Sequence, residues 1–307
     1  MRLARSSMFV SATLAIALSV VACAPTGGGE ERPRDPVPDE LGQVGRRAVA
    51  IAAAGDIAQR AEPSGANVQT AGLVEDLAPD AVLTLGDNQY EDGELAEYLD
   101  SYGLTWGRFK DITYPTPGNH DYHIEGAEGY FDYFGEVSNP PNGYYSFDLG
   151  NWHLVAVNSG DGVSDEQLAW IRSDLASDRH LCELAYWHHP RWSSGDNHGS
   201  DPDMAPLWRL MVRQGVDVVL NGHDHLYERF ARMNASGERD RDGVRQIIAG
   251  TGGDSLYRFG DAETGSEVRI SEYGVLTMVL SDHRYAWGFL RAEDGAVLDD
   301  GRTACHA

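Results

Sequence analysis

The chain has 307 residues, 48 aspartates and glutamates against 24 lysines and arginines, a formal net charge of −24 at pH 7, and 42% hydrophobic residues. The hydrophobic fraction excludes a disordered chain, and at ~100–200 residues per domain the length fits one large or two small globular domains. The acidic excess would repel phosphate backbones, which argues against a nucleic-acid-binding role and favours metals as the cations of any site.

The N-terminus has the composition of a secretion signal. Arg2 and Arg5 precede an apolar run over residues 8–21 that ends in small residues. This run is short for a membrane span, which needs about 20 apolar residues. We therefore expect a signal peptide over residues 1–22 and export of the remainder.

The sequence Val20-Val21-Ala22-Cys23 resembles the lipobox of bacterial lipoproteins, with valine in place of the usual leucine. In such proteins the cysteine is acylated and becomes the new N-terminus. The residues that follow are rich in Gly, Pro and charge, which is typical of a flexible linker. We expect a lipid anchor on Cys23 to the bacterial cell membrane, facing outside the cytoplasm, and a flexible stalk over residues 23–47. The alternative is an ordinary signal peptide that happens to contain a cysteine.

Lipidation of Cys23 would leave Cys182 and Cys305 as a pair. Disulfides persist in the oxidising compartments outside the cytoplasm. We expect these two cysteines to be bridged, with two buried thiols as the alternative.

The first part of the domain has the pattern of a β–α–β unit. Apolar runs end at Gly55-Asp56 and at Gly86-Asp87, and a helical stretch over residues 68–77 lies between them. Short apolar runs without alternation are typical of strands buried on both faces, so parallel pairing is expected. A second helical stretch (94–102) then leads to a strand (113–116) that ends near Gly118-Asn119-His120-Asp121.

The remaining elements follow in the same manner. Residues 144–147 and 153–158 predict an antiparallel hairpin, and a helix is expected to open at Ser164 and run to about residue 176. We expect one α/β domain over residues 48–307 that holds two packed sheets. The other predicted elements are strands at 181–187, 216–220, 245–250, 275–281, 285–291 and 296–298, and a helix at 204–214.

Five polar clusters follow predicted strands. Ligands of open α/β sheets bind beyond the carboxyl ends of the strands, where loops converge. Each cluster alone has an ordinary explanation, such as a helix cap or a turn. Together they offer only oxygen and imidazole donors, and a carboxylate such as that of Asp87 can bridge two cations ~3.5–4 Å apart, an arrangement suited to phosphoester hydrolysis. The clusters are Asp56; Asp87 with Tyr90; Asn119 with His120; His188 with His189; and His223 with His225.

In this order, the motifs resemble those of the calcineurin-like metallophosphoesterase superfamily, over nearly all of residues 50–255. Tyr90, three residues after Asp87, and the run Tyr227-Glu228-Arg229 resemble purple acid phosphatases more narrowly. The resemblance implies an α/β fold: a four-layer α/β/β/α sandwich of two mixed sheets, with a dinuclear metal site at the carboxyl edge of the strands.

The resemblance also implies the ligands. Asp56, Tyr90 and His225 would bind the first metal, Asp87 would bridge, and Asn119, His188 and His223 would bind the second. A phenolate suits a trivalent ion, so the expected cofactors are Fe(III) and a divalent ion, which in the family is Fe, Zn or Mn.

For catalysis, the resemblance implies that a hydroxide held by the metals attacks the phosphorus of a small phosphate ester. His120 would contact the substrate and stabilise or protonate the leaving alkoxide, and Asp121 would orient His120. His198 is a weaker candidate for phosphate binding or acid catalysis. We expect supporting or incidental roles for His123, His189 and Asp224.

The leading hypothesis is an exported, metal-dependent phosphoric monoester hydrolase. A phosphodiesterase is the alternative within the superfamily, because the same metal pair cleaves either bond. A non-catalytic lipoprotein that binds an anion or a metal is the alternative from another class. Such a binding protein would not need His120.

Overall fold

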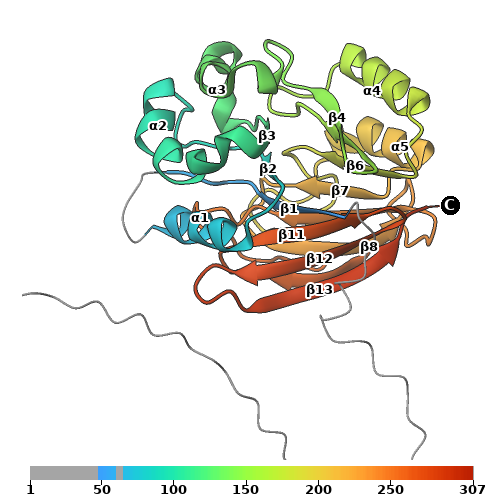
Figure 1. Cartoon of the computed structure of the whole chain (residues 1–307). Coiled ribbons are helices and arrows are strands. Elements are labelled where there is room, and N and C mark those ends of the chain that lie inside the picture. The colour runs from blue at the N-terminus through green and yellow to red at the C-terminus, as the bar shows by residue number, and fades with distance from the viewer. Residues whose placement is uncertain (1–47, 60–64, 307) are drawn as a thin grey trace, which may run out of the picture. The chain divides into compact units, whose positions relative to one another are not determined.

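The computed structural model describes residues 48–59 and 65–306. Figure 1 shows two β-sheets packed against each other, with helices on their outer faces. The predicted signal peptide (1–22), the lipid anchor at Cys23 and the stalk (23–47) lie outside the described residues. None of the helices in the described part is long and apolar enough to span a bilayer.

The first sheet has six strands in the order β13-β12-β11-β1-β2-β3. Strands β1, β2 and β3 are parallel, as the β–α–β pattern predicts, whereas β11 to β13 pair antiparallel and β11 joins β1. The strands are β1 (Val49–Ala54), β2 (Ala81–Leu85), β3 (Thr113–Thr116), β11 (Gly274–Ser281), β12 (Arg284–Arg291) and β13 (Val297–Ala304).

The second sheet has seven strands in the order β10-β8-β9-β7-β6-β5-β4. Strands β5, β6, β7 and β9 are parallel, and the predicted hairpin is the antiparallel pair β4–β5. The strands are β4 (Tyr145–Leu149), β5 (Trp152–Ala156), β6 (Cys182–Tyr186), β7 (Val218–Asn221), β8 (Tyr227–Met233), β9 (Val244–Ala249) and β10 (Ser266–Ile270).

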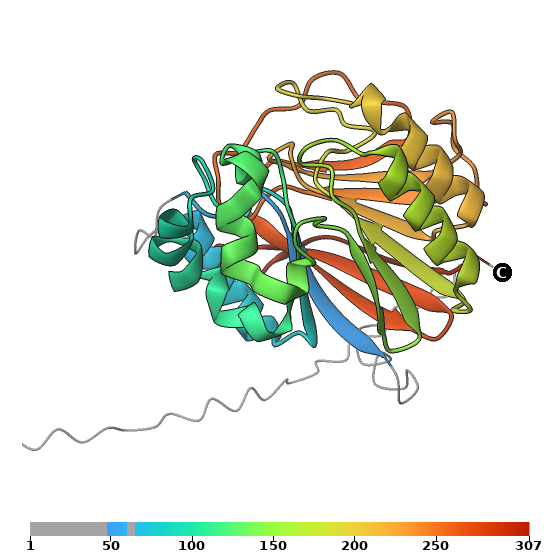
Figure 2. The ribbon, with the colours of Figure 1, turned by 90° about the horizontal axis from the view of Figure 1, so that it is seen from above.

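Helices cover the outer face of each sheet (Figure 2). Helices α1, α2 and α3 pack on the six-stranded sheet, and α4 and α5 pack on the seven-stranded sheet. The side chain of Ser164 caps α4 by accepting a hydrogen bond from the Gln167 amide at 3.1 Å, as its sequence predicts. The helices are α1 (Ala66–Leu77), α2 (Leu95–Asp100), α3 (Glu128–Phe134), α4 (Asp165–Ser177) and α5 (Ala205–Gln214).

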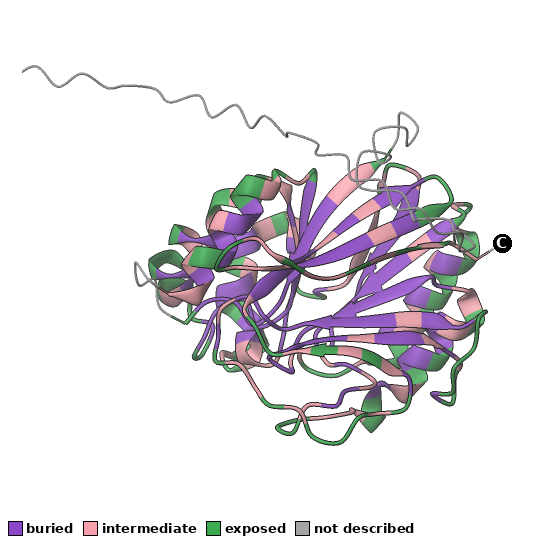
Figure 3. Cartoon of the chain, turned by 90° about the horizontal axis from the view of Figure 1, so that it is seen from below, coloured by how far each residue is buried: buried purple, intermediate pink, exposed green. Residues whose placement is uncertain are grey.

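The alternation of side chains along the strands builds three apolar layers. In β1, Ile51 and Ala53 face the other sheet, while Ala52 and Ala54 face the helices. In β6, Leu184 likewise lies between the sheets. Figure 3 shows the central strands buried on both faces. The predicted four-layer α/β/β/α sandwich is therefore confirmed.

A disulfide joins Cys182 at the start of β6 to Cys305 just after β13, with a Cα–Cα distance of 5.6 Å. This confirms the predicted bridge. It links strands of the two different sheets across 123 residues of sequence. A bridge of this kind stabilises a fold by about 2–4 kcal/mol, mainly by restricting the unfolded chain.

Among the α-helices and strands of the described residues, three were not predicted: α3 (Glu128–Phe134), β8 (Tyr227–Met233) and β10 (Ser266–Ile270). Strand β8 contains Glu228, Arg229 and Arg232, so its sequence lacks the apolar alternation of a strand. The buried Glu228 carboxylate is satisfied because it accepts hydrogen bonds from Ser194 and Ser266. In addition, the strand predicted at 296–298 is longer in the structure, where β13 covers Val297–Ala304. It is an edge strand whose side chains are half-buried or exposed.

Candidate metal centre

The predicted metal ligands come from strand ends of both sheets. Asp56 follows β1, Asp87 follows β2 and Asn119 follows β3 in the six-stranded sheet. His188 follows β6, and His223 and His225 follow β7, in the seven-stranded sheet. These strands run parallel within each sheet, so their carboxyl ends meet at one edge and bring the ligands together.

One group of donors surrounds the Tyr90 hydroxyl. This oxygen lies 3.0 Å from Asp56 Oδ1, 2.9 Å from Asp87 Oδ2 and 3.1 Å from His225 Nε2. His225 Nε2 is in turn 3.3 Å from Asp56 Oδ1. All four side chains are buried. The group therefore offers three potentially anionic oxygens and one imidazole nitrogen to a single cation.

A second group of donors begins on the other side of Asp87. His188 Nε2 lies 3.2 Å from Asp87 Oδ2 and 3.2 Å from His223 Nδ1. Asn119 stands next to His120, whose amide donates to Asp87 Oδ1 at 2.8 Å. Because Asp87 contacts members of both groups, its carboxylate is placed to bridge two cations.

The hydrogen bonds of the imidazoles show that this group fits a cation. His188 Nδ1 donates to the Leu85 carbonyl at 2.8 Å, and His225 Nδ1 donates to the Ser255 carbonyl at 2.7 Å. A carbonyl only accepts, so Nδ1 of each ring carries a proton and Nε2 is the atom that a cation would take when the ring is neutral. The lone pair of His188 then faces His223 Nδ1, an arrangement that needs a shared proton or cation.

Asn119 supplies independent evidence that the second group of donors could hold a cation. Its Oδ1 atom is buried and has no hydrogen-bond partner among the described residues. Buried amide oxygens are nearly always paired, so an unpaired one on the residue directly before His120, whose amide binds Asp87, is a candidate metal ligand. The residues present thus fit two cations.

The pKa values of Tyr90 and His188 agree with a centre that holds two cations. Burial, together with the charges of Asp56 and Asp87, raises the pKa of Tyr90 well above its ordinary value. Burial lowers the pKa of His188, but the adjacent Asp87 outweighs it and raises that pKa to about 9. Without cations, the centre therefore keeps protons on the phenol and on His188, and cations would replace them.

Backbone geometry at the centre is unusual. Asp56, Asp87 and His223 have φ angles of 59°, 46° and 71°, in the left-handed region that residues with a Cβ rarely adopt. Gly86 has a φ of 85°, and a Cβ there would lie 2.5 Å from His188 Nδ1. The turns after the strands are thus strained or tightly packed where the ligands point inward.

His120 lies at the rim of the centre, where it is half-buried. Its Nδ1 donates to the Glu91 carbonyl at 2.7 Å, and its ring packs against Tyr90 with the ring centroids 4.3 Å apart. Because Nδ1 carries this proton, Nε2 is left for a substrate. His123 shares the same acceptor through its own Nδ1, at 3.1 Å, and is exposed.

Asp121 does not orient the His120 ring, contrary to the prediction. Its buried carboxylate accepts hydrogen bonds from the Gly118 amide at 2.8 Å, from Asn88 Nδ2 at 3.0 Å and from the Tyr98 hydroxyl. Asp121 therefore fastens the loop after β3 to the loop after β2. It acts on the backbone that carries His120 and not on the imidazole.

His198 is exposed, and its ring stacks on His223 with a centroid distance of 4.1 Å. Partial desolvation of the ring, which stacks on His223, lowers the pKa of His198 below its ordinary value. Its loop is held by Asp224, which accepts hydrogen bonds from Ser193 Oγ and from the Gly199 amide at 3.2 Å. The Oδ2 atom of Asp224 therefore supports the loop that carries His198.

His189 packs beside the second donor group. Its ring centroid is 4.3 Å from that of His223, and its amide and Nδ1 both contact Ser159 Oγ at 3.1 Å. Burial and the neighbouring His188 lower the pKa of His189 to about 3. His189 is thus a neutral supporting residue.

Sequence reasoning missed the segment after β9. Tyr257 stacks on His225 at a centroid distance of 3.9 Å, and Asp254 Oδ2 lies 3.7 Å from His225 Nδ1. The available signal was the position of Gly250-Thr251-Gly252-Gly253 directly after a predicted strand. The segment that follows carries a sixth cluster of polar side chains at a strand end, which includes Asp254 and Tyr257.

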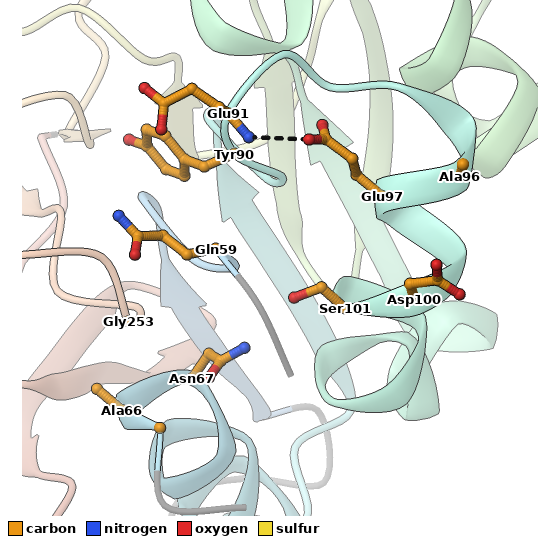
Figure 4. A pocket seen from close by; sticks show the side chains of 11 residues that line it. Gln59, Ala66, Asn67, Tyr90, Glu91, Ala96, Glu97, Asp100, Ser101 and Gly253 are labelled. Carbon is orange, nitrogen blue, oxygen red and sulfur yellow. Dashed lines mark hydrogen bonds between the residues drawn. The ribbon is translucent and has the colours of Figure 1, made fainter. Parts of the chain in front are cut away.

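A cavity of about 730 Å³ borders the centre (Figure 4). Tyr90 and Gly253 line it on the side of the metal ligands, and Glu97 and Asp100 of α2 line it on the other side. The Glu97 carboxylate accepts a hydrogen bond from the Glu91 amide at 3.3 Å, which ties α2 to the segment after Tyr90. The described lining of the cavity carries the carboxylates of Glu91, Glu97 and Asp100.

The chain is similar in sequence to known proteins. Over 215 residues the chain is 30% identical to purple acid phosphatase 15 of Arabidopsis thaliana. This alignment covers 57% of the chain and 40% of the plant protein. Over 289 residues it is 28% identical to purple acid phosphatase 21 of the same plant, covering 84% and 65%. The chain thus spans less than two thirds of the length of these relatives.

The fold is similar to the solved structure of purple acid phosphatase PPD1 from yellow lupin (Lupinus luteus) seeds. The TM-score is 0.71 and the identity 18%, and the match covers 86% of this chain and 54% of that one. The sequence profile described as "Calcineurin-like phosphoesterase" matches residues 49–227. Together with the two donor groups that share Asp87, this match shows that the chain belongs to the calcineurin-like phosphoesterase family.

Proposed function

We propose that the protein is an exported, metal-dependent phosphoric monoester hydrolase with a purple acid phosphatase type of centre. The observation that carries this proposal is the convergence of two donor groups on Asp87, one of which contains the Tyr90 phenol. The similarity to plant purple acid phosphatases supports the same activity.

The donors favour two different ions. Asp56, Asp87 and Tyr90 can supply three negative charges to the first site, which suits a trivalent ion such as Fe(III). Beyond the shared Asp87, the ligands of the second site are neutral (Asn119, His188 and His223), which suits divalent Fe, Zn or Mn. When bound, such a pair neutralises phosphate charge and lowers the pKa of water, which supplies a nucleophile at neutral pH.

The rim residues of this chain act on the ester. His120 Nδ1 is held by the Glu91 carbonyl, so a protonated Nε2 can donate its proton to the leaving oxygen. His198, stacked on His223, can donate a hydrogen bond to a phosphate oxygen. The cavity beside Tyr90 provides space for the alcohol part of a small ester.

The test combines metal analysis, a visible spectrum and turnover of p-nitrophenyl phosphate and bis-p-nitrophenyl phosphate by the full chain purified in detergent. We expect iron, a broad visible band from an iron–phenolate bond, and faster turnover of the monoester. Tyr90→Phe should lose the band. Tyr257→Phe is the matched control, because Tyr257 also touches His225 but is not placed as a ligand.

Each other outcome would change a different part of the proposal. Faster diester turnover would make the protein a phosphodiesterase. A colourless, metal-loaded and active protein would remove the assignment of Tyr90 to iron. Stoichiometric metal without turnover of either ester would favour the binding protein.

For localisation, we propose export and a lipid anchor on Cys23. The N-terminal sequence and the disulfide between Cys182 and Cys305 support this, because disulfides persist outside the cytoplasm. In a bacterial host, the full chain should incorporate labelled palmitate and partition into the detergent phase, whereas Cys23→Ser should do neither. An unlabelled wild-type chain would contradict the anchor.

A further inference from the structure

A second group of histidines and aspartates lies at the far edge of the seven-stranded sheet. Asp148 is near the end of β4 and His153 is near the start of β5, and the two residues pair across the hairpin. Asp178 and His180 lie between α4 and β6. The ligands of the dinuclear centre follow the carboxyl ends of the parallel strands, so this group is at the opposite edge.

Four atoms of this group form a closed ring. His153 Nδ1 is 2.8 Å from Asp148 Oδ1 and 3.9 Å from Asp178 Oδ1. His180 Nδ1 is 2.7 Å from Asp178 Oδ1 and 3.9 Å from Asp148 Oδ1. The four separations average about 3.3 Å, which is the distance between neighbouring ligands of a tetrahedral ion with bonds of about 2.0 Å. Each of the four residues offers a ligand atom within 4.8 Å of those of the other three.

A further pair of side chains orients His153 toward this ring. Its Nε2 lies 2.9 Å from Asp174 Oδ2, and the Ser146 hydroxyl donates to Asp174 Oδ1 at 2.9 Å. Metal-bound histidines typically donate their other N–H to a carboxylate that is itself hydrogen-bonded. A proton on Nε2 leaves the Nδ1 lone pair facing the carboxylates of Asp148 and Asp178, so a cation belongs between them.

Burial and ligand type narrow the kind of ion. The side chains of His153 and Asp178 are only 9% and 7% exposed, whereas that of Asp148 is 61% exposed and gives an ion access from solvent. Two imidazoles with two carboxylates match the nitrogen and oxygen preferences of zinc, and no thiolate takes part. The competing occupant is a proton, which would make His153 an imidazolium held by Asp148 and Asp174.

We propose that Asp148, His153, Asp178 and His180 bind one zinc ion. The ion joins the β4–β5 hairpin to the connection between α4 and β6, at the opposite edge from the dinuclear centre. Its role is structural: it stabilises this end of the sheet and takes no part in hydrolysis. The proposal is independent of the function proposed for the dinuclear centre.

The test counts zinc per chain in the full-length protein after its catalytic metals are loaded, by equilibrium dialysis against ZnCl₂ and mass spectrometry. Wild type should bind one zinc more than His180→Ala. Zinc should also raise the melting temperature of wild type by about 5 °C at about 100 times the dissociation constant, and that shift should vanish in His180→Ala. His180 is partly exposed, so its replacement should leave the fold intact.

Two further variants sharpen this test. Asp174→Asn, which changes an orienting residue, should weaken zinc binding about 10–100-fold. His283→Ala, which removes an exposed histidine elsewhere on the surface, should bind zinc as wild type does. Zinc that exchanges into the dinuclear centre adds equally to every variant. Equal zinc counts and equal thermal shifts in wild type and His180→Ala would overturn the proposal. The site would then hold a proton, with His153 as an imidazolium.

Discussion

Replacement of Asp87 by asparagine is expected to remove both metals and to lower turnover by at least about 10⁴-fold. Asp87 Oδ2 is the atom shared by the two donor groups, 2.9 Å from the Tyr90 hydroxyl and 3.2 Å from His188 Nε2. Its Oδ1 is already used by the His120 amide. In the variant, the amide oxygen would keep that hydrogen bond, and the NH₂ group would point into the centre, where a cation needs an acceptor.

The measurement is metal content per chain and kcat for p-nitrophenyl phosphate, with a melting curve to check the fold. Asp80→Asn is the matched control. Asp80 precedes β2 at the opposite end from Asp87, and its carboxylate accepts a hydrogen bond from the Ala50 amide at 2.8 Å. The control should keep both metals and full turnover. An Asp87→Asn protein with both metals and wild-type turnover would show that the two donor groups do not share this carboxylate.

The positions of the ligands could be predicted because their signal is local. An apolar run followed by a polar residue marks a strand end, and parallel strands bring those ends to one edge. Asp56, Asp87 and His188 were placed in this way, and the structure joins them. Strand β8 gave no such signal, because Glu228 is buried through hydrogen bonds from serines that are distant in sequence.

The orientation of side chains could not be predicted. Asp121 follows His120 directly in sequence, yet a tight helical turn over His120–Tyr122 buries the Asp121 carboxylate beneath the loop while His120 stays at the rim. Neighbours in a sequence therefore need not act on each other. Tyr257 shows the converse case: it is distant from His225 in sequence but contacts it. This contact could not be predicted because it depends on how the glycine-rich segment after β9 folds back.

The zinc group proposed at the far edge depends on register. Asp148 and His153 are five residues apart and pair across a tight hairpin whose strands run over Tyr145–Leu149 and Trp152–Ala156. In the hairpin predicted over 144–147 and 153–158, Asp148 falls in the turn. The prediction therefore did not pair Asp148 with His153. An error of one or two residues in the predicted strand ends was thus enough to prevent prediction of the contact between Asp148 and His153.

His120→Ala is expected to lower kcat about 10²–10⁴-fold while the metal content stays that of wild type. His120 contacts Asp87 through its backbone amide, which alanine retains, so the donor groups should be unaffected. The imidazole itself is lost, and with it the proton donor for the leaving oxygen. The measurements are metal per chain, kcat and KM. His123→Ala is the matched control, because His123 hydrogen-bonds the same Glu91 carbonyl from an exposed position.

Comparison of two monoesters separates acid catalysis from positioning. p-Nitrophenolate leaves without needing a proton, whereas an alkyl alkoxide needs one. If His120 protonates the leaving oxygen, the loss in His120→Ala should be much larger for an alkyl phosphate than for p-nitrophenyl phosphate. Equal losses would assign His120 to phosphate binding. Unchanged turnover of both esters would remove it from the mechanism, and a wild-type protein that binds metal and phosphate but hydrolyses neither ester would be the binding lipoprotein.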